Sequence, residues 1–391
     1  MFFFHCISFN KKNMNWIFNN DHFVGYYKKP IPIQKIHANF SSNTGLTKAA
    51  VFDLDHTLIK PTDNKIFSKN DSDWTFFSPK IINKLKSLNN DYEIIIVTNQ
   101  HGITSGKTNK DLWISKINKF ALLLNIPFTI LVSIQKNYYR KPNTKLWDDY
   151  IDSNYQIIKD KSFYCGDAAG LQKRNINGIN LPKDFSDSDL KFALNIDIKF
   201  IHRDEFVFDV NYKEIQPNYP IDFTKLSINK YNKFIPEHQE LIIMVGFPGS
   251  GKSYYVKNYL SLNYFHVSLD KYKSSNKCIN LCKKKLEEGD SVVIDNTNPS
   301  IESRKKFIDI AKKLNIKIRC IFFTTDELLS FHNNHFRSKI NNSKIVPKIA
   351  YNIYKKKFIE PCIKEGFYKI NKIDFILENH NNLSEYYLFY F

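Results

Sequence analysis

A glycine-rich segment in the second half of the chain leaves few folds open to it. Between an apolar run, Leu241 to Val245, and a helical stretch, Ser253 to Leu260, the sequence reads Gly246-Phe247-Pro248-Gly249-Ser250-Gly251-Lys252-Ser253. This G-x-x-x-x-G-K-S pattern between a strand and a helix lets backbone N–H groups surround a phosphate chain. Lys252 is expected to reach the β- and γ-phosphates, and the Ser253 hydroxyl to hold Mg²⁺. The segment predicts a nucleotide-binding site; a chance glycine-rich turn is the alternative.

Phosphoryl transfer from such a site requires two further side chains. Asp270 follows the next apolar run, Tyr264 to Leu269, where its carboxylate could take the proton of an attacking hydroxyl. Arg337 lies near the end of the last long helical stretch and could clamp the transferred group. Each has a plain alternative, Asp270 as a helix N-cap and Arg337 as a surface arginine.

Two aspartates follow another apolar run in the first half. Asp53-Leu54-Asp55-His56-Thr57 comes directly after the expected strand Ala49 to Phe52, and residues two apart project from the same side of an extended chain. One carboxylate can attack phosphorus, and the other, if its pKa is raised, can protonate the leaving oxygen and then activate water. Mg²⁺ would shield the carboxylates from the phosphate. The alternative is a solvated pair in a turn.

Three further polar residues occur in a consistent order, which favours phosphate chemistry over that alternative. Thr98 ends the strand that begins at Glu93, and its hydroxyl can bind a phosphate oxygen. Lys141, in Tyr139-Arg140-Lys141-Pro142, can neutralise an aspartyl-phosphate, and Asp167, in Gly166-Asp167-Ala168-Ala169-Gly170, can complete a metal site. Polar residues at the carboxyl ends of parallel strands belong at one active edge.

From Ala49 onwards short apolar runs alternate with amphipathic stretches, which is typical of parallel sheets with helices on both faces. The expected strands are 49–52, 93–97, 128–133, 162–165, 241–245, 292–294 and 317–323. The expected helices are 78–88, 109–124, 253–260, 278–288, 301–313 and 326–336. The fold class is α/β, with parallel-sheet domains at 46–212 and 238–391 and a proline-containing linker at 213–237.

Composition narrows the class of protein less sharply. Residues 1–45 lack clean periodicity and are expected to be an N-terminal extension, either disordered or an acid-poor targeting segment. The formal net charge of +18 suggests a polyanion partner, but only six of the 57 basic residues are Arg, which also fits a coding bias towards Lys. The six Cys show no zinc spacing, and Cys278 and Cys282 are expected to be buried thiols. No apolar run approaches the roughly 18 residues of a membrane span.

Together these motifs resemble the haloacid dehalogenase phosphatase superfamily joined to a P-loop kinase, and more closely the bifunctional polynucleotide kinase 3′-phosphatases. The resemblance covers about residues 46 to 375 and extends to Ser72-Asp73-Trp74, Lys183-Asp184-Phe185-Ser186, Phe192-Ala193-Leu194-Asn195, Asp295-Asn296-Thr297-Asn298-Pro299 and His332-Asn333-Asn334. It implies a Rossmannoid phosphatase domain followed by a P-loop kinase domain.

The resemblance also implies a role for each candidate residue. In the phosphatase, Asp53 would be the nucleophile and Asp55 the general acid/base, with Thr98 and Lys141 binding phosphate. The implied Mg²⁺ ligands are Asp53, Asp55 and Asp167 in the first domain and Ser253 in the second. In the kinase, ATP would bind the segment Gly246 to Ser253, Asp270 would be the base, and Arg304 and Arg337 would be phosphate or lid contacts.

Three residues depart from the family pattern. His56 stands where Gly is usual, so its side chain could crowd the phosphate pocket. Leu269 stands where an Arg often precedes the acceptor-site Asp, and His335 where a lid Arg is common. The change at Leu269 is expected to weaken acceptor binding, and the change at His335 is expected to weaken ATP binding.

The resulting expectation is DNA strand-break end processing, with removal of 3′-phosphate through an aspartyl-phosphate and ATP-dependent phosphorylation of 5′-hydroxyl ends. The alternatives are an RNA (tRNA) end-healing enzyme, a catalytically weakened scaffold that binds DNA ends, and a nucleotide phosphatase paired with a metabolite kinase. A monomer is expected, with DNA ends and other repair proteins as partners. Its expected location is the nucleus, or else a mitochondrion or another organelle that contains DNA.

Overall fold

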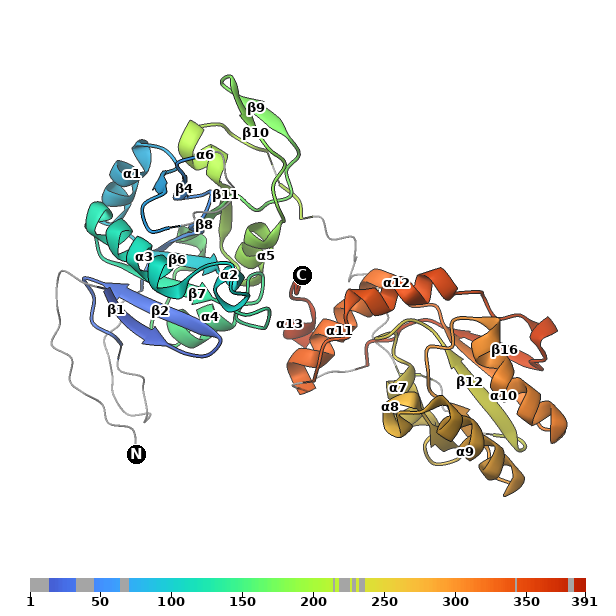
Figure 1. The fold of residues 1–391 in the computed structure, drawn as a ribbon. Coiled ribbons are helices and arrows are strands. Elements are labelled where there is room, and N and C mark those ends of the chain that lie inside the picture. The colour runs from blue at the N-terminus through green and yellow to red at the C-terminus, as the bar shows by residue number, and fades with distance from the viewer. Residues whose placement is uncertain are drawn as a thin grey trace, which may run out of the picture. The chain divides into compact units, whose positions relative to one another are not determined.

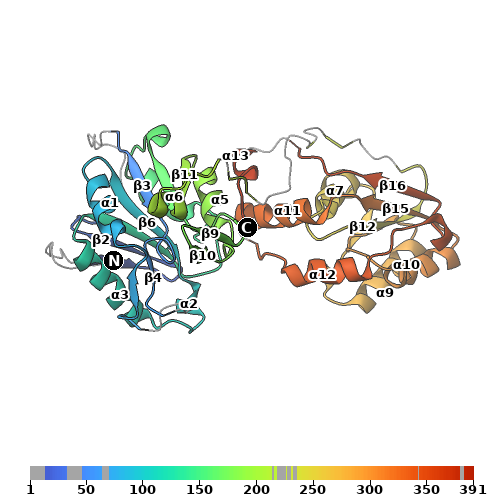
Figure 2. The ribbon, with the colours of Figure 1, turned by 90° about the horizontal axis from the view of Figure 1, so that it is seen from above.

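The chain forms two compact units in the computed structural model, which describes residues 14–32, 46–63, 70–213, 215–217, 226, 230–231, 236–341, 343–378 and 383–391. The first unit comprises Met1–Tyr219 with Leu388–Phe391, and the second comprises Pro220–Tyr387 (Figure 1 and Figure 2). Each unit has its own sheet and its own apolar core. Within the described ranges, no helix has the length and apolar character to cross a membrane.

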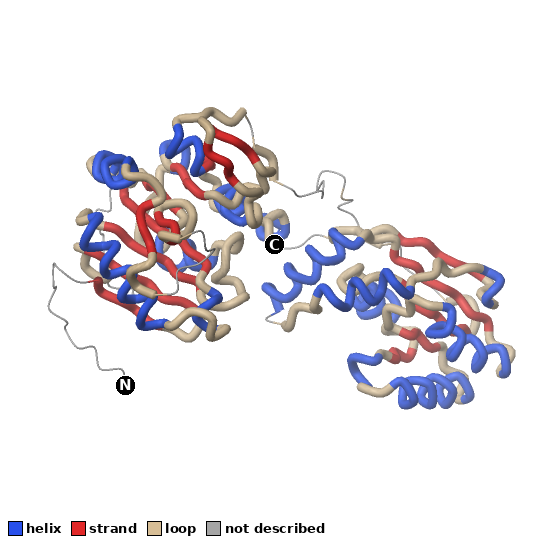
Figure 3. The backbone as a smooth tube through the Cα atoms, turned by 45° about the horizontal axis from the view of Figure 1, so that its top comes forward, coloured by secondary structure: helices blue, strands red, loops and turns tan. Residues whose placement is uncertain are grey.

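The first unit is built on a seven-stranded sheet with the order β1-β2-β7-β6-β3-β8-β11 (Figure 3). Its strands are β1 (Met14–Phe18), β2 (His22–Tyr27), β3 (Ala49–Phe52), β6 (Glu93–Asn99), β7 (Phe128–Ser133), β8 (Phe163–Gly166) and β11 (Lys199–His202). The strands from β7 to β11 are parallel, whereas β1 and β2 add an antiparallel edge. The predicted parallel sheet is therefore confirmed.

Helices cover both faces of this sheet. On β3, Ala50 and Phe52 pack with residues of α1 (Lys80–Leu88) and α3 (Lys110–Leu124), whereas Ala49 and Val51 pack with residues of α5 (Ser188–Asn195). The other helical segments are α2 (His101–Thr104), α4 (Lys145–Trp147), a π turn (Asp148–Asp152), a 3₁₀ turn (Lys159–Lys161) and α6 (Arg203–Phe208). Two small antiparallel pairs complete the unit, β4 (Ile59–Pro61) with β5 (Trp74–Phe76), and β9 (Arg174–Ile176) with β10 (Ile179–Leu181).

The N-terminal segment differs from the sequence-based expectation. Residues 14–27 do not form an extension apart from the domain, because β1 and β2 continue its sheet, and every residue of β2 is buried. Phe23 belongs to the core on one face and Val24 to the core on the other. A strand buried on both faces has no polar alternation, so its sequence lacks the expected two-residue period. The rest of the predicted extension, 1–13 and 33–45, lies outside the described residues.

The second unit has a five-stranded parallel sheet with the order β13-β14-β12-β15-β16. The strands are β12 (Glu240–Val245), β13 (Phe265–Val267), β14 (Val292–Ile294), β15 (Lys317–Phe323) and β16 (Lys369–Ile373). The helices are α7 (Lys252–Tyr255) with a π turn (Val256–Leu260), α8 (Leu269–Tyr272), α9 (Ser275–Glu287), α10 (Ile301–Lys313), α11 (Glu327–Asn341), α12 (Lys348–Lys357), a 3₁₀ turn (Ile363–Glu365) and α13 (Leu383–Tyr386). Cys278 and Cys282 on α9 are buried free thiols, as predicted.

The predicted domain boundaries differ from the structure more than the predicted strands do. Much of the predicted linker 213–237 lies outside the described residues, but Tyr231 is buried and packs edge-on against Tyr255 in the second unit. At the other end, the last four residues belong to the first unit rather than to the predicted second domain. The Asn195 side chain accepts from the backbone N–H of Phe389 and donates to its carbonyl.

Candidate active sites

Three carboxylates meet at the carboxyl edge of the first sheet. Asp53 follows β3 and Asp167 follows β8, which is its neighbour, and Asp189 lies in the first turn of α5. One oxygen of each lies within 4.8 Å of the others, which suits a cation such as Mg²⁺ that prefers oxygen ligands. Asp53 and Asp167 were predicted to share this site, and Asp189 was not.

Lys141 forms ion pairs with two of these carboxylates. Its Nζ lies 2.6 Å from Asp53 Oδ1 and 2.8 Å from Asp189 Oδ1, and it also donates to the Tyr164 hydroxyl at 2.7 Å. Burial alone would lower the pKa of Lys141, but Asp189 and Asp53 outweigh burial and raise it. The ammonium therefore stays charged. Asn99 fixes the backbone of this lysine, accepting from its N–H and donating to its carbonyl.

Asp53 and Asp167 bind a proton more readily than an exposed aspartate does. Burial raises the pKa of Asp53 well above its usual value, against the opposing effect of Lys141. Burial, followed by the charge of Asp189, raises the pKa of Asp167 to about 6. Repulsion among buried carboxylates favours uptake either of protons or of a metal ion. The donor set therefore fits a bound Mg²⁺.

Asp55, which was also predicted to be a metal ligand, is not part of this cluster. Its Oδ2 accepts from Gln100 Nε2 at 2.5 Å, and its Oδ1 lies 3.5 Å from the Nζ of Lys116 on α3. Burial would raise the pKa of Asp55, but Lys116 and Gln100 outweigh burial and lower it. Asp55 is therefore an ionised carboxylate paired with a buried lysine in this structure. To act as the predicted acid, it must take up a proton in another state of the site.

The remaining predicted residue of this site, Thr98, is buried at the end of β6. Its hydroxyl accepts from Gln100 Nε2 at 2.9 Å, so one amide links Thr98 to Asp55. Thr57 donates to Asp167 Oδ1 at 3.2 Å, which joins the loop after β3 to the loop after β8. The sequence order of the motifs thus corresponds to a single constellation in space.

The second unit presents its phosphate loop between β12 and α7, as predicted. Gly249 has φ +79°, and a Cβ there would lie 2.2 Å from the carbonyl oxygen of Ser330, so only glycine fits. Asn333 on α11 donates to the carbonyl of Gly249 at 3.1 Å, and Thr325 donates to that of Ser250 at 3.0 Å. Helix α11 therefore supports the loop directly.

Lys252 turns back onto its own loop. Its Nζ donates to the carbonyls of Gly246 at 2.9 Å and Phe247 at 2.6 Å, and burial lowers its pKa to about 8. A phosphate chain would provide stronger acceptors for the same ammonium. Asp295, which follows β14, has the largest opposing effect on this pKa, ahead of that of Asp270. No role was predicted for Asp295, and its place after a strand in the quoted Asp295-Asn296 motif was the available signal.

A cavity of about 390 Å³ adjoins the phosphate loop. Lys252, Ser253 and Arg337 line it, and its other lining residues include Tyr231, Phe336, Phe375, Ile376 and Leu377. An apolar slot beside a phosphate loop suits the base and sugar of a nucleotide. Arg337, predicted as a phosphoryl clamp, is exposed and lines this cavity.

Comparison with known proteins decides the family. A model described as polynucleotide kinase 3 phosphatase matches residues 48–207, and an AAA-domain model matches residues 241–361. The bifunctional polynucleotide phosphatase/kinase of Schizosaccharomyces pombe is 39% identical over 339 residues, covering 84% of this chain and 80% of that protein. The chain belongs to the bifunctional polynucleotide phosphatase/kinase family.

Two further relatives match different shares of this chain. A protein of Acanthamoeba polyphaga mimivirus, named as a candidate for the same two activities, is 37% identical and covers 94% of this chain and 91% of its own length. The polynucleotide 3′-phosphatase of Saccharomyces cerevisiae is 30% identical over 39% of this chain and 84% of its own length. The relative named as a phosphatase therefore matches less than half of this chain, whereas the two relatives named for both activities match most of it.

The structure shows the surroundings of all three residues that depart from the family pattern. His56 adopts φ +63°, the left-handed conformation that favours glycine, which explains why glycine is usual there. Leu269, next to Asp270, is 46% exposed, so the loss of the family arginine leaves an apolar surface beside the predicted base. His335 packs edge-on against Phe331 rather than lining the cavity, and burial lowers its pKa to about 4.

Arg304 corrects one assignment within this phosphatase/kinase. It was expected to be a phosphate or lid contact, but its side chain is fully buried and forms two hydrogen bonds with Glu365, at 2.7 and 2.8 Å. It also donates to the carbonyls of Asn298, Pro299 and Ile359. Arg304 is thus a structural residue that holds the segment after β14 against the C-terminal part of the unit.

Proposed function

We propose that this enzyme repairs the ends of DNA strand breaks, removing a 3′-phosphate with its first domain and phosphorylating a 5′-hydroxyl with its second. One observation carries the proposal: a single chain of this family holds both a buried aspartate–lysine phosphate site and a phosphate loop with an adjoining nucleotide-sized cavity. The two sites would convert 3′-phosphate and 5′-hydroxyl ends into the 3′-hydroxyl and 5′-phosphate ends that a ligase requires.

In the proposed phosphatase reaction, an oxygen of Asp53 attacks phosphorus and displaces the 3′-oxygen, which receives a proton from Asp55. Water then attacks the aspartyl-phosphate, gives its proton to Asp55 and releases orthophosphate. Lys141 balances the charge of Asp53 and of the transferred group. Mg²⁺ held by Asp53, Asp167 and Asp189 would supply positive charge to the phosphate oxygens.

In the proposed kinase reaction, the 5′-hydroxyl gives its proton to Asp270 and attacks the γ-phosphorus of ATP, so that ADP leaves. Lys252 and the backbone of the phosphate loop would bind the phosphates, with Ser253 as the Mg²⁺ ligand. Arg337, on the cavity wall, would contact the transferred group. Leu269 provides no charge for the DNA backbone, so acceptor binding is proposed to be the weaker part of this site.

The proposal extends to the setting of the reaction. The enzyme is proposed to act as a monomer, because each site is built within one unit of a single chain. The nucleus is its proposed location, with other repair proteins as partners. RNA ends are the competing substrate, because they can carry the same 3′-phosphate and 5′-hydroxyl groups and differ from DNA ends at the 2′-hydroxyl.

The test uses a nicked duplex that carries a labelled 3′-phosphate and a labelled 5′-hydroxyl, in DNA and in matched RNA. Wild-type enzyme with Mg²⁺ should remove the 3′-phosphate without ATP and should phosphorylate the 5′ end only with ATP. Asp53→Asn should abolish only the first activity and Lys252→Ala only the second, so each variant is the folding control for the other. Faster processing of the RNA ends would overturn the DNA assignment, and inactivity on both substrates would overturn the proposed function.

A further inference from the structure

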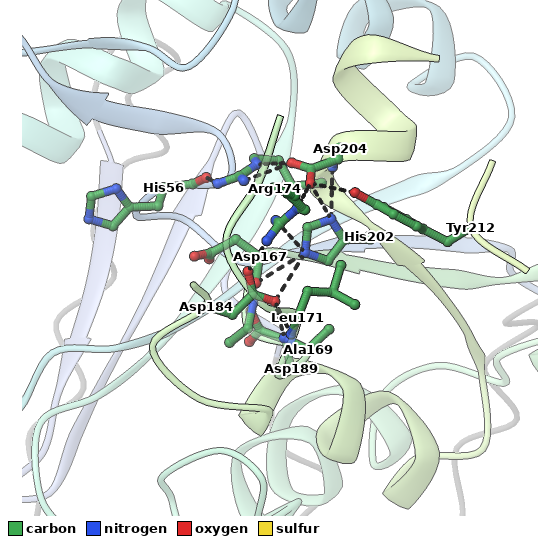
Figure 4. Close-up of polar contacts among 12 residues, drawn as sticks. His56, Asp167, Ala169, Leu171, Arg174, Asp184, Asp189, His202, Asp204 and Tyr212 are labelled. Atoms are coloured by element: carbon green, nitrogen blue, oxygen red, sulfur yellow. Dashed lines mark hydrogen bonds and ion pairs between the residues drawn. The ribbon is translucent and has the colours of Figure 1, made fainter. Parts of the chain in front are cut away.

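A buried charged cluster in the phosphatase domain takes no part in the reactions above (Figure 4). Asp204, in the first turn of α6, has a fully buried side chain. Its carboxylate accepts from Arg174 Nε at 2.5 Å, from Arg203 Nη2 at 2.7 Å and from the Tyr212 hydroxyl at 3.0 Å. These residues, with His202 and Asp184, are the Asp204 cluster.

One arm of the Asp204 cluster reaches the loop of the nucleophile. Arg203 Nη1 donates to the carbonyl oxygen of His56 at 2.7 Å, while its Nε and Nη2 both remain on Asp204. His56 lies between Asp55 and Thr57, and its left-handed backbone is strained in an L-residue. A hydrogen bond from a charged donor is stronger than one between neutral groups and can offset that strain. Arg203 therefore stabilises the turn that carries the acid/base.

Two other arms reach the loop of Asp167. The N–H of Asp204 donates to His202 Nδ1 at 3.0 Å, and Nε2 of the same ring lies 3.2 Å from the carbonyl oxygen of Asp167. Arg174 donates to Asp184 Oδ1 at 2.9 Å, and Asp184 Oδ2 accepts from the N–H groups of Ala169 and Leu171. Both arms hold backbone groups, and neither contacts a reacting atom.

We propose that the Asp204 cluster positions the phosphatase site, with Arg203 fixing the Asp55-His56-Thr57 turn relative to Asp167. The inference rests on the proposed phosphatase activity and adds residues that act through other residues. A buried ionic cluster is weak evidence of a role in stability, because apolar residues of equal size often stabilise a fold equally well. The hydrogen bonds of the Asp204 cluster end on two loops, the one that carries Asp55 and the one that carries Asp167. Apolar residues could not fix these loops relative to each other, because they cannot form hydrogen bonds with the backbone.

The decisive variant is Arg203→Met, which keeps a long side chain to pack on Phe77, whose ring lies 4.4 Å from the guanidinium. Loss of a residue that supports a catalytic group typically lowers activity about 10–100-fold, and we expect this loss in kcat with KM nearly unchanged. Kinase activity of the same molecules should not change. Adding His56→Gly should recover part of the lost kcat, because glycine adopts φ +63° without support.

The matched control is Arg203→Met with His56→Ala, which removes the imidazole but keeps the strained backbone and should recover nothing. Unchanged kcat in Arg203→Met, or equal recovery with alanine and glycine, would overturn the inference. If Arg203→Met does not fold, Arg203→Lys, which keeps the charge but loses the fork, must show the same loss and the same rescue. An aryl phosphate serves as a second substrate, so turnover there without action on DNA ends would sink the proposed function while still testing the cluster.

Discussion

The Nζ of Lys141 lies 2.6 Å from Oδ1 of Asp53, and both side chains are buried. Among the described ion pairs, Lys141 is the only cation that contacts Asp189, and it also contacts Asp53, the predicted nucleophile. A nucleophile whose pKa is raised by burial depends on such a partner to remain ionised. The ion pair therefore determines the fraction of enzyme molecules in which Asp53 is ionised and can attack phosphorus.

Lys141→Met should remove phosphatase activity while leaving the kinase intact. Without the ammonium, Asp53 and Asp189 repel each other, Asp53 takes up a proton more readily, and the transferred phosphate loses a charge partner. The loss of one preorganised electrostatic contact costs about 10²–10³ in kcat, and the same range is expected here. The measurement is single-turnover release of phosphate from a 3′-phosphorylated oligonucleotide. Activity within tenfold of wild type would show that Lys141 is structural.

The stabilising effect of Mg²⁺ on the phosphatase unit should grow with pH. Burial raises the pKa of Asp167 to about 6, so the metal-free folded state binds a proton that the unfolded chain releases above about pH 4. The proton bound by Asp167 therefore stabilises the folded state at low pH. This contribution to the free energy of unfolding is lost as the pH rises through 6, by up to about 1.4 kcal/mol per pH unit. Mg²⁺ binds the ionised form, so the gain over EDTA should be larger at pH 7 than at pH 5.

Tryptophan fluorescence can follow this unfolding selectively, because all four tryptophans, Trp16, Trp74, Trp113 and Trp147, belong to the first unit. Asp167→Asn is the control and should remove most of the pH dependence of the Mg²⁺ effect. An equal gain from Mg²⁺ at both pH values would contradict a metal site at these carboxylates.

The strands and their terminal motifs could be predicted because each residue type has a local meaning. Apolar runs of strand length ended in Asp53, Thr98 and Gly246, and parallel strands bring such ends to one edge. Asp189 could not be selected in this way, because Asp187 and Asp189 both lie near the start of α5 and only packing turns one of them inward. Gly166, where a Cβ would lie 2.4 Å from Asp189 Oδ2, shows how closely this carboxylate packs on β8, and that contact is visible only in the fold.

Arg304 was assigned to a phosphate or lid contact, and Lys116 was not singled out, for the same physical reason. Lys116 lies on α3, and its side chain is buried beside Asp55. Arg304 lies one turn into α10 and could equally have pointed to a phosphate, but Glu365, 61 residues later, neutralises it. The partner of a long charged side chain is a tertiary property that spacing along one helix does not reveal.

Arg304→Met and Arg337→Met should separate stability from catalysis in the kinase. Arg304→Met leaves Glu365 buried without its partner, which costs about 3–5 kcal/mol. Arg337 is exposed on the cavity wall, so its loss should change stability little but lower kcat by about 10²-fold or more. Thermal inactivation of the kinase and single-turnover 5′-phosphorylation measure the two effects. Reversed outcomes would return Arg304 to the list of phosphate contacts.

Leu269→Arg should strengthen acceptor binding by the kinase. Leu269 is 46% exposed beside Asp270, so an arginine there adds a charge near the 5′ end without disturbing the core. One new phosphate contact should lower KM for 5′-hydroxyl DNA and steepen the salt dependence of log KM by about 0.7–0.9. Leu262→Arg is the matched control, because Leu262 is 94% exposed and precedes β13, at the amino edge of the sheet. The same effect in both variants would show that added charge alone is responsible, whereas an effect confined to Leu269→Arg would place the DNA backbone beside Asp270.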